Sequence, residues 1–188
     1  MPPKVKTSRE DIISAALGLI RESGAQALNA RAIAARLGCS TQPIFSNFES
    51  MEQLEQDTIT AAYNLYTDFI VRESESQKYP RYKAYGMAYI RFASEERELF
   101  KLLFMRDRTG EDITPSPDFE QSVALIMDAS GISAEQAQLI HLELWIWVHG
   151  IGVMFATSFL SFDWETVSGM LSDVYHGILL RHLEEKTK

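Results

Sequence analysis

The chain has 188 residues, a formal net charge of −8 at pH 7 and a single cysteine, Cys39. This length is enough for a compact core without disulfides or a metal. A lone cysteine excludes an internal disulfide and a cysteine-based zinc site, and it favours a reducing cytoplasm. The first residues contain no apolar stretch of signal-peptide length, so we expect no export.

The acidic net charge by itself argues against a nucleic-acid partner, because phosphate binding requires a local positive potential. The charges are unevenly distributed, however. Residues 1–48 carry six basic and three acidic side chains, whereas the remaining residues carry 12 basic and 23 acidic ones. A small basic head on an acidic body is typical of an end that docks on duplex DNA joined to a solvated or partner-facing end.

Apolar residues recur every three or four positions and alternating β-branched runs are absent, so the sequence predicts an all-α fold of about nine helices. The first helix is expected to begin near Ser8, where two capping boxes overlap, and to end at Gly24. The second is expected between the N-cap Asn29 and the helix-ending Gly38.

A third, short helix is expected to be capped by Ser40, to carry Pro43 in its first turn and to end near Phe48. A long fourth helix begins at the capping box Ser50-x-x-Gln53 and runs to about residue 75. The sequence predicts further helices at residues 81–94, 96–105, 118–129, 133–158 and 163–185, and a loop at 106–117.

The run from Leu139 to Leu160 is apolar and long enough to cross a bilayer. His141, Glu143 and His149 interrupt it, and ionisable groups at bilayer depth cost roughly 2.5–3.5 kcal/mol each. We therefore expect a buried helix of a soluble protein and no membrane partner.

The two short helices within residues 29–48 are too brief to persist alone, so they depend on packing against the first helix. Ile44 and Phe48 are four residues apart and are expected to be the buried anchors of the third helix. Its other faces carry Thr41, Gln42, Pro43, Phe45, Ser46 and Asn47. This surface contains no acidic group and suits the major groove, because amides pair with adenine and apolar groups contact thymine methyls. The alternative is an ordinary helical hairpin with a polar outer face.

The segment from about Ser8 to Leu54 resembles the head of the TetR family of bacterial transcription regulators. The resemblance rests on the run ALNARAIAARLGCS from Ala27 to Ser40, followed by Pro43-Ile44-Phe45, Asn47-Phe48, Ser50, Glu52 and Leu54. Three residues depart from the family pattern: Phe45 replaces the usual Tyr, Met51 the usual Lys, and Gln42 a frequent Gly or Ala. Two phosphate contacts are therefore expected to be missing, which leaves more of the backbone binding to Lys4, Lys6, Thr41 and helix N-termini.

Composition, pattern and resemblance together give a set of expected DNA-binding residues. They are Lys4, Lys6, Asn29, Arg31, Ser40, Thr41, Gln42, Pro43, Phe45, Ser46 and Asn47. Of these, Gln42 and Asn47 are expected to contact bases.

The resemblance implies a helix-turn-helix DNA-binding domain at residues 1–50 and a helical ligand-binding and dimerisation domain at 51–188. It implies a non-enzymatic, cytoplasmic, ligand-responsive regulator. The simplest form is a repressor that binds a palindromic double-stranded operator as a homodimer and is released by a small molecule. The homodimer would pair the last two long helices, where Gly150, Gly152 and Ala156 permit close approach. The segment Trp147-Val148-His149-Gly150 is similar to, although one residue shorter than, a Trp-x-x-His-Gly element of one branch of these C-terminal domains.

The effector is expected to be small and apolar or aromatic, held by side chains of the middle helices. The candidates are Tyr63, Tyr66, Phe92, Phe104, Trp145, His149 and Phe155, although ordinary core packing is the more common role of such residues. No cofactor is expected. No metal is expected either, because Asp173 and His176 share a helical face but the second Glu-x-x-His element of a di-iron bundle is absent.

Two other classes of function compete with the regulator. A helical enzyme or ligand carrier would need a nucleophile with its base, a glycine-rich phosphate loop or a metal set, and none of these is apparent. A purely structural helical bundle leaves the basic head unexplained.

Overall fold

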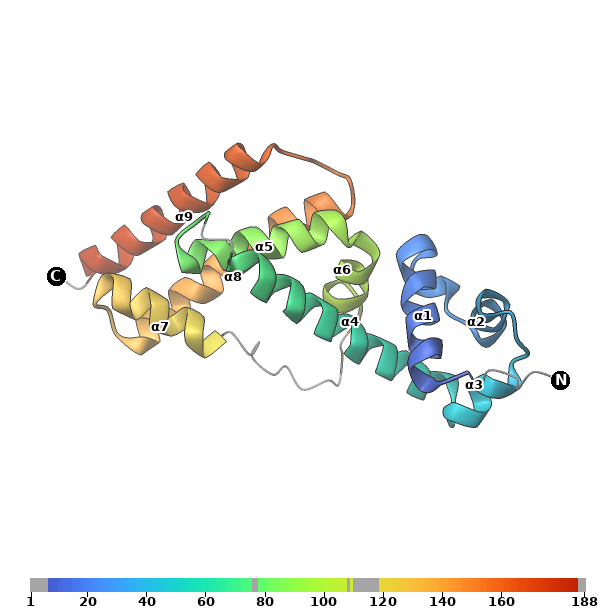
Figure 1. Ribbon diagram of the computed structural model, residues 1–188. Coiled ribbons are helices and arrows are strands. Elements are labelled where there is room, and N and C mark those ends of the chain that lie inside the picture. The colour runs from blue at the N-terminus through green and yellow to red at the C-terminus, as the bar shows by residue number, and fades with distance from the viewer. Residues whose placement is uncertain (1–6, 76–77, 108, 110–118, 186–188) are drawn as a thin grey trace. The chain divides into compact units, whose positions relative to one another are not determined.

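The computed structural model describes residues 7–75, 78–107, 109 and 119–185 (Figure 1). Within these residues the regular structure is entirely helical, with nine α-helices and one short 3-10 helix, η1. The predicted all-α fold is therefore confirmed. Most of the loop expected at residues 106–117 lies outside the described residues.

Every predicted helix is present, and its ends agree with the expected ones to within about two residues. In chain order they are α1 Arg9–Ser23, η1 Ala25–Ala27, α2 Ala30–Leu37, α3 Gln42–Asn47, α4 Met51–Ser74, α5 Arg81–Glu95, α6 Arg97–Phe104, α7 Phe119–Ser130, α8 Ala134–Ala156 and α9 Trp164–Glu185. One cap differs from expectation. The residue that precedes α3 is Thr41 instead of Ser40, and its side chain makes no capping hydrogen bond.

The chain divides into two compact units. Unit 1 comprises Met1–Asp68 and Glu96–Asp107, and unit 2 comprises Phe69–Glu95 and Arg108–Lys188. The boundary falls inside α4, which continues as one helix from the first unit into the second.

The core of unit 1 joins α1, α2, α3 and the first turn of α4. Its buried side chains are Ile12, Ala15, Ala16, Ile33, Ala34, Ile44, Phe48 and Leu54. The larger of these contribute about 1.5–3 kcal/mol each through burial. Because they come from four consecutive elements, the three short N-terminal helices are stable only as a group.

Unit 2 is built on α8, which packs against α5, α7 and α9. One apolar cluster joins α5, α8 and α9, and a second joins α7, α8 and α9. Two tyrosines of α5 hydrogen-bond to histidines of α8. Tyr82 Oη lies 3.0 Å from His141 Nδ1, and Tyr89 Oη lies 2.9 Å from His149 Nδ1. Burial raises the pKa of Tyr89 and lowers that of His149, which favours the neutral form of both groups. The imidazole tautomer sets which of the two donates the hydrogen bond.

Among the described helices, α8 alone is long and apolar enough to span a membrane by length and composition. Within its most apolar window, 39% is buried inside the structure. The buried residues include Ile140, Leu144 and Ile151, which belong to the two clusters of unit 2. One side of α8 therefore packs inside unit 2, whereas Leu142 and Ile146 on α8 are exposed.

Candidate DNA-binding head

The turn between α2 and α3 is set by two local signals. Asn29 begins α2, because its side chain accepts a hydrogen bond from the Ala32 N–H at 2.9 Å. Gly38 ends the helix with φ 65°, a left-handed conformation that favours glycine. Both features were predicted. Together they fix where α2 begins and ends, and so where the turn that leads to α3 begins.

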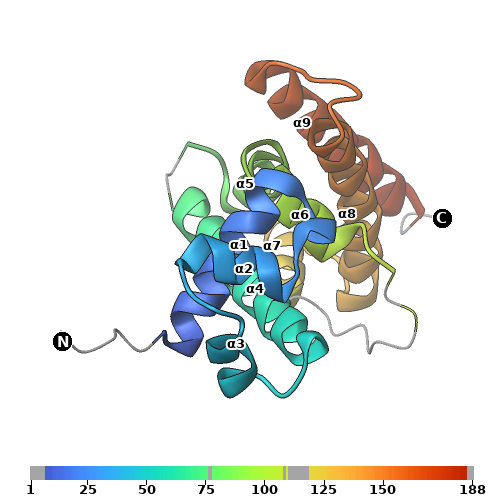
Figure 2. The same ribbon diagram turned by 90° about the vertical axis from the view of Figure 1, so that its right-hand side faces the viewer.

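The third helix is held by the two anchors that the sequence indicated. Ile44 is 0% exposed and Phe48 is 2% exposed, and both belong to the core of unit 1. Figure 2 shows α3 and α2 beside α1, and α1 contacts both of them. With these two side chains turned inward, the opposite face of α3 points outward.

The outward face of α3 is formed by Gln42, Phe45 and Ser46, which are all exposed. Phe45 keeps 54% of its surface exposed, which is high for a phenylalanine. The Ser46 hydroxyl donates to the Gln42 carbonyl at 2.9 Å. Thr41 and Pro43 are half-buried beside this face, which contains no acidic side chain.

The two amide side chains of α3 differ in what they can offer a ligand. Asn47 Nδ2 donates to the Pro43 carbonyl at 2.7 Å and to the Thr7 carbonyl at 3.4 Å. Its two amide hydrogens are therefore engaged within the chain. The Gln42 amide is exposed and makes no hydrogen bond among the described residues, so it retains both a donor and an acceptor.

Most arginines of the head are neutralised by acidic residues of the same unit. Arg21 forms a two-point pair with Glu96, with both nitrogen–oxygen distances at 2.8 Å, and Arg36 pairs in the same way with Glu22. The hydrogen bond from Arg36 holds the pKa of Glu22 below its usual value.

Arg9 is also paired, with Asp57. Arg31 is exposed on α2 and is the arginine of the described head that has no acidic partner. The positive charge available to a ligand is therefore smaller, and more localised, than the composition of residues 1–48 indicates.

The remaining predicted DNA-binding residues are placed as follows. Asn29 and Ser40 are exposed at the start of α2 and in the turn before α3, whereas Lys4 and Lys6 lie outside the described residues. The pair formed by Arg9 and Asp57 was not among the predicted site residues. The two residues are 48 positions apart, so no local pattern could have indicated their contact.

The predicted effector residues take part in several aromatic contacts. In unit 1, the ring centroids of Tyr66 and Phe104 are 5.1 Å apart, and those of Tyr63 and Tyr66 are 5.7 Å apart. In unit 2, Phe92 packs edge-on against Phe69 at 5.5 Å.

Two further clusters in unit 2 contain stacked rings. Trp145 stacks on His149 at 5.2 Å, and Phe155 stacks on Trp164 at 5.6 Å. Trp145 is 44% exposed, whereas Phe155 is buried in the core shared by α5, α8 and α9.

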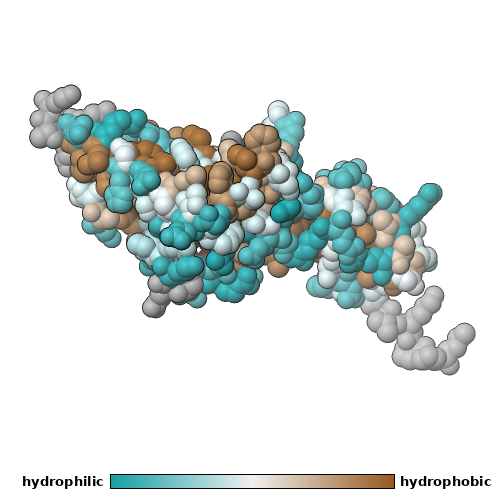
Figure 3. Space-filling model, turned by 90° about the horizontal axis from the view of Figure 1, so that it is seen from above, coloured by the Kyte–Doolittle hydropathy of each residue, from teal (hydrophilic) through white to brown (hydrophobic). Residues whose placement is uncertain are grey.

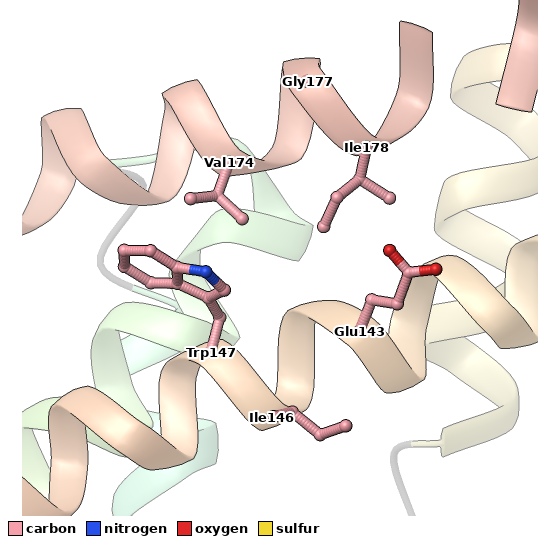
Figure 4. Close-up of a pocket in the computed structure, with 6 residues that line it drawn as sticks. All are labelled: Glu143, Ile146, Trp147, Val174, Gly177 and Ile178. Carbon is pink, nitrogen blue, oxygen red and sulfur yellow. The ribbon is translucent and has the colours of Figure 1, made fainter. Parts of the chain in front are cut away.

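A groove that was not predicted from the sequence runs between α8 and α9 (Figure 4). Its lining residues are Glu143, Ile146, Trp147, Val174, Gly177 and Ile178. In Figure 4, Trp147 and Glu143 point toward α9, whereas Ile146 points away from it. Arg181 of α9 pairs with Glu143 at the edge of the groove.

The α8 and α9 helices also carry most of the exposed large apolar side chains of unit 2. They are Leu139, Leu142, Trp145, Ile146 and Trp147 on α8 and Leu180 on α9. Apolar patches on this unit are visible as brown surface in Figure 3. On α8, Leu139, Leu142 and Ile146 follow the three- and four-residue spacing of a single helix face. In the described part of the chain, no group of three or more His, Cys, Asp or Glu side chains could hold a metal ion.

Comparison with known proteins bears directly on this head. The profile of the family described as bacterial regulatory proteins, tetR family, matches residues 12–56. This range contains the turn, the α3 anchors and the start of α4. A search of curated proteins gives no match.

Solved structures share the fold over almost the entire chain. A TetR-like transcriptional regulator from Rhodococcus sp. RHA1 is 14% identical, with a TM-score of 0.67 over 98% of each chain. A putative TetR-family regulator from Vibrio parahaemolyticus is 16% identical, with a TM-score of 0.60 over 89% of this chain and 96% of that one. A TetR variant from Acinetobacter baumannii in complex with minocycline is 16% identical, with a TM-score of 0.55 over 96% and 98%.

These findings confirm the predicted all-α fold class, and the profile match agrees with the predicted family over the N-terminal segment. The chain carries the N-terminal domain of the TetR family of bacterial regulatory proteins at residues 12–56, on the all-α fold of solved TetR-like regulators.

Proposed function

We propose that the chain is a cytoplasmic repressor that binds a palindromic operator as a homodimer and leaves the DNA when a small molecule binds. The observation that carries this proposal is the outward face of α3, which is free of acidic groups and lies within the matched family profile of residues 12–56. Residues 1–50 form the DNA-binding domain in this proposal. Residues 51–188 form the effector and dimerisation domain.

Within the head, Gln42 and Phe45 are the residues best suited to read bases. A glutamine amide with both functions unused pairs with the N6 and N7 edge of adenine, and an exposed phenyl ring suits a thymine methyl. Asn47 offers DNA only its carbonyl oxygen, because its amide hydrogens are bound within the chain. The other candidates are proposed to contact phosphates or the groove edge. They are Lys4, Lys6, Asn29, Arg31, Ser40, Thr41, Pro43 and Ser46.

The exposed apolar faces of α8 and α9 favour the homodimer. Isolated apolar side chains are normal on a surface, but these are contiguous along one helix and border a groove. A twofold arrangement of such faces is self-complementary. It would also supply two heads, as a palindromic site with half-sites about 34–36 Å apart requires.

The effector is proposed to be small and apolar or aromatic. The A. baumannii relative of similar fold binds minocycline. The present chain carries aromatic clusters at Tyr63, Tyr66 and Phe104 in unit 1, and at Trp145 with His149 in unit 2. Phe92 and Phe155 are fully packed, so their part would be to shape the core beside the effector.

The proposal as a whole is tested by gel shift with DNA from upstream of the protein's own gene. A regulator gives a shifted band that weakens steeply with salt, because phosphate contacts release counterions. An enzyme, a carrier or a structural bundle gives no sequence-dependent shift.

Gln42→Ala is expected to weaken binding to the cognate operator by about 1–3 kcal/mol and to relax the preference at one base pair. Competition gel shifts with single-base operator variants measure both effects. Gln56→Ala, an exposed glutamine on α4, is the matched control and should bind as the wild type does. An equal loss of affinity for operator and random DNA after Gln42→Ala would contradict base reading.

Arg31→Ala is expected to weaken binding to all DNA sequences and to lower the slope of log K against log salt by about one. Arg31→Lys keeps the charge and should keep the slope. Fluorescence anisotropy across a salt series measures the slope. An unchanged slope for Arg31→Ala would show that the unpaired arginine does not contact phosphate.

A further inference from the structure

The recognition helix α3 has little means of holding its own position. It contains only six residues, one of its side chains is buried, and its N-cap residue Thr41 makes no side-chain capping bond. A helix this short is unstable in isolation. Its orientation must therefore be fixed by contacts with other elements.

Arg9 makes three such contacts at the far end of α3. Its Nη1 donates to the Asn47 carbonyl at 2.5 Å, and its Nη2 donates to the Asp57 carboxylate. The guanidinium carbon lies 4.2 Å from the centre of the Phe48 ring. The planar, forked guanidinium can serve all three partners at once, which a lysine ammonium cannot do.

The three partners connect the end of α3 to α4. Asn47 ends α3, where a terminal carbonyl lacks a partner within its own helix. Phe48 is buried in the core, and Asp57 is on α4. The Asn47 amide adds a second link to the same place, because it donates to the Thr7 carbonyl just before α1.

We propose that Arg9 is a positioning residue that ties the end of the recognition helix to Asp57 of α4, and that it does not itself bind DNA. This inference rests on the proposed function of α3. Since Asp57 belongs to the early part of α4, the pair holds the end of α3 at a set position relative to that part of α4, within the same unit.

Asp57→Asn distinguishes a positioning role from a purely electrostatic effect, because the two explanations predict opposite changes in operator affinity. Removal of a negative charge from a DNA-binding head strengthens attraction to phosphate. Loss of the charged hydrogen bond to Arg9 instead releases α3, and it is expected to lower operator affinity about tenfold. Operator affinity that is unchanged or higher in Asp57→Asn would overturn the proposal.

Arg9→Lys is the second variant, because it keeps the charge and loses the fork. We expect it to lower operator affinity while leaving the salt slope unchanged, in contrast to Arg31→Ala. A slope that falls by about one in Arg9→Gln, with α3 undisturbed, would identify Arg9 as a phosphate contact and overturn the proposal.

Amide hydrogen exchange of the free protein provides a readout without DNA. Both Asp57→Asn and Arg9→Lys should speed exchange at the Phe48 amide, which donates to the Ile44 carbonyl at 2.9 Å. The Ile33 amide of α2, which donates to the Asn29 carbonyl at 3.1 Å, is the internal control for an intact head and should stay protected. Unchanged exchange at Phe48 would overturn the positioning role. Failure of the wild type to bind any DNA would instead reject the proposed function.

Discussion

Ile146→Glu is expected to convert the protein from a dimer to a monomer and to reduce operator affinity by about a hundredfold or more. Ile146 is 57% exposed in the single chain, so a glutamate there costs the monomer little. In a dimer that covers this face of α8, the same carboxylate would be buried without a partner, at a cost of several kcal/mol. The loss of DNA affinity follows because two linked heads bind far more tightly than one.

Sedimentation velocity measures the oligomeric state, and gel shift with a palindromic operator measures affinity. Ala129→Glu on α7 adds the same charge at another exposed position of unit 2, and it should leave both properties unchanged. If Ile146→Glu remained dimeric with full operator affinity, the proposed dimer face would be wrong.

Phe48→Ala is expected to destabilise unit 1 by about 3–5 kcal/mol and to abolish operator binding. The ring is 2% exposed within the core that joins α1, α2 and α4, and the Arg9 guanidinium lies over it. Truncation leaves a cavity and removes one of the two anchors of α3. Urea denaturation followed by circular dichroism measures the loss.

Phe45→Ala is the matched control for this experiment, since it makes the same chemical change three residues earlier at a 54% exposed position. Its unfolding free energy should change by less than about 0.5 kcal/mol, while its operator affinity should fall through loss of the thymine contact. Equal destabilisation by the two variants would show that α3 is not oriented by its buried face.

The effect of Phe48→Ala depends on a feature that could be predicted from the sequence. Ile44 and Phe48 are one helical turn apart, so their shared face follows from the backbone period alone. The caps at Asn29 and Gly38 likewise act within a few residues, and both occur where they were expected. Helix caps and the buried face of a helix can be predicted from the sequence because the atoms that interact are close along the chain.

The α8–α9 groove could not be predicted from local sequence signals. The sequence placed both helices correctly, and it suggested that they meet a second copy. It could not show that Glu143 and Trp147 point toward α9 while Ile146 points away (Figure 4). The rotation of each helix about its axis is set by packing against α5 and α7 as well as by its own pattern.

The sequence by itself determined the helices, their caps, the buried anchors of α3 and the family of the head, because these depend on periods and contacts of a few residues. Only the tertiary structure decided which cations stay unpaired. Arg21 pairs with Glu96 across 75 positions and Arg9 with Asp57 across 48, so the charge of the head cannot be counted from its composition. The physical reason is that an ion pair depends on distance in space, which the fold sets and the local sequence does not.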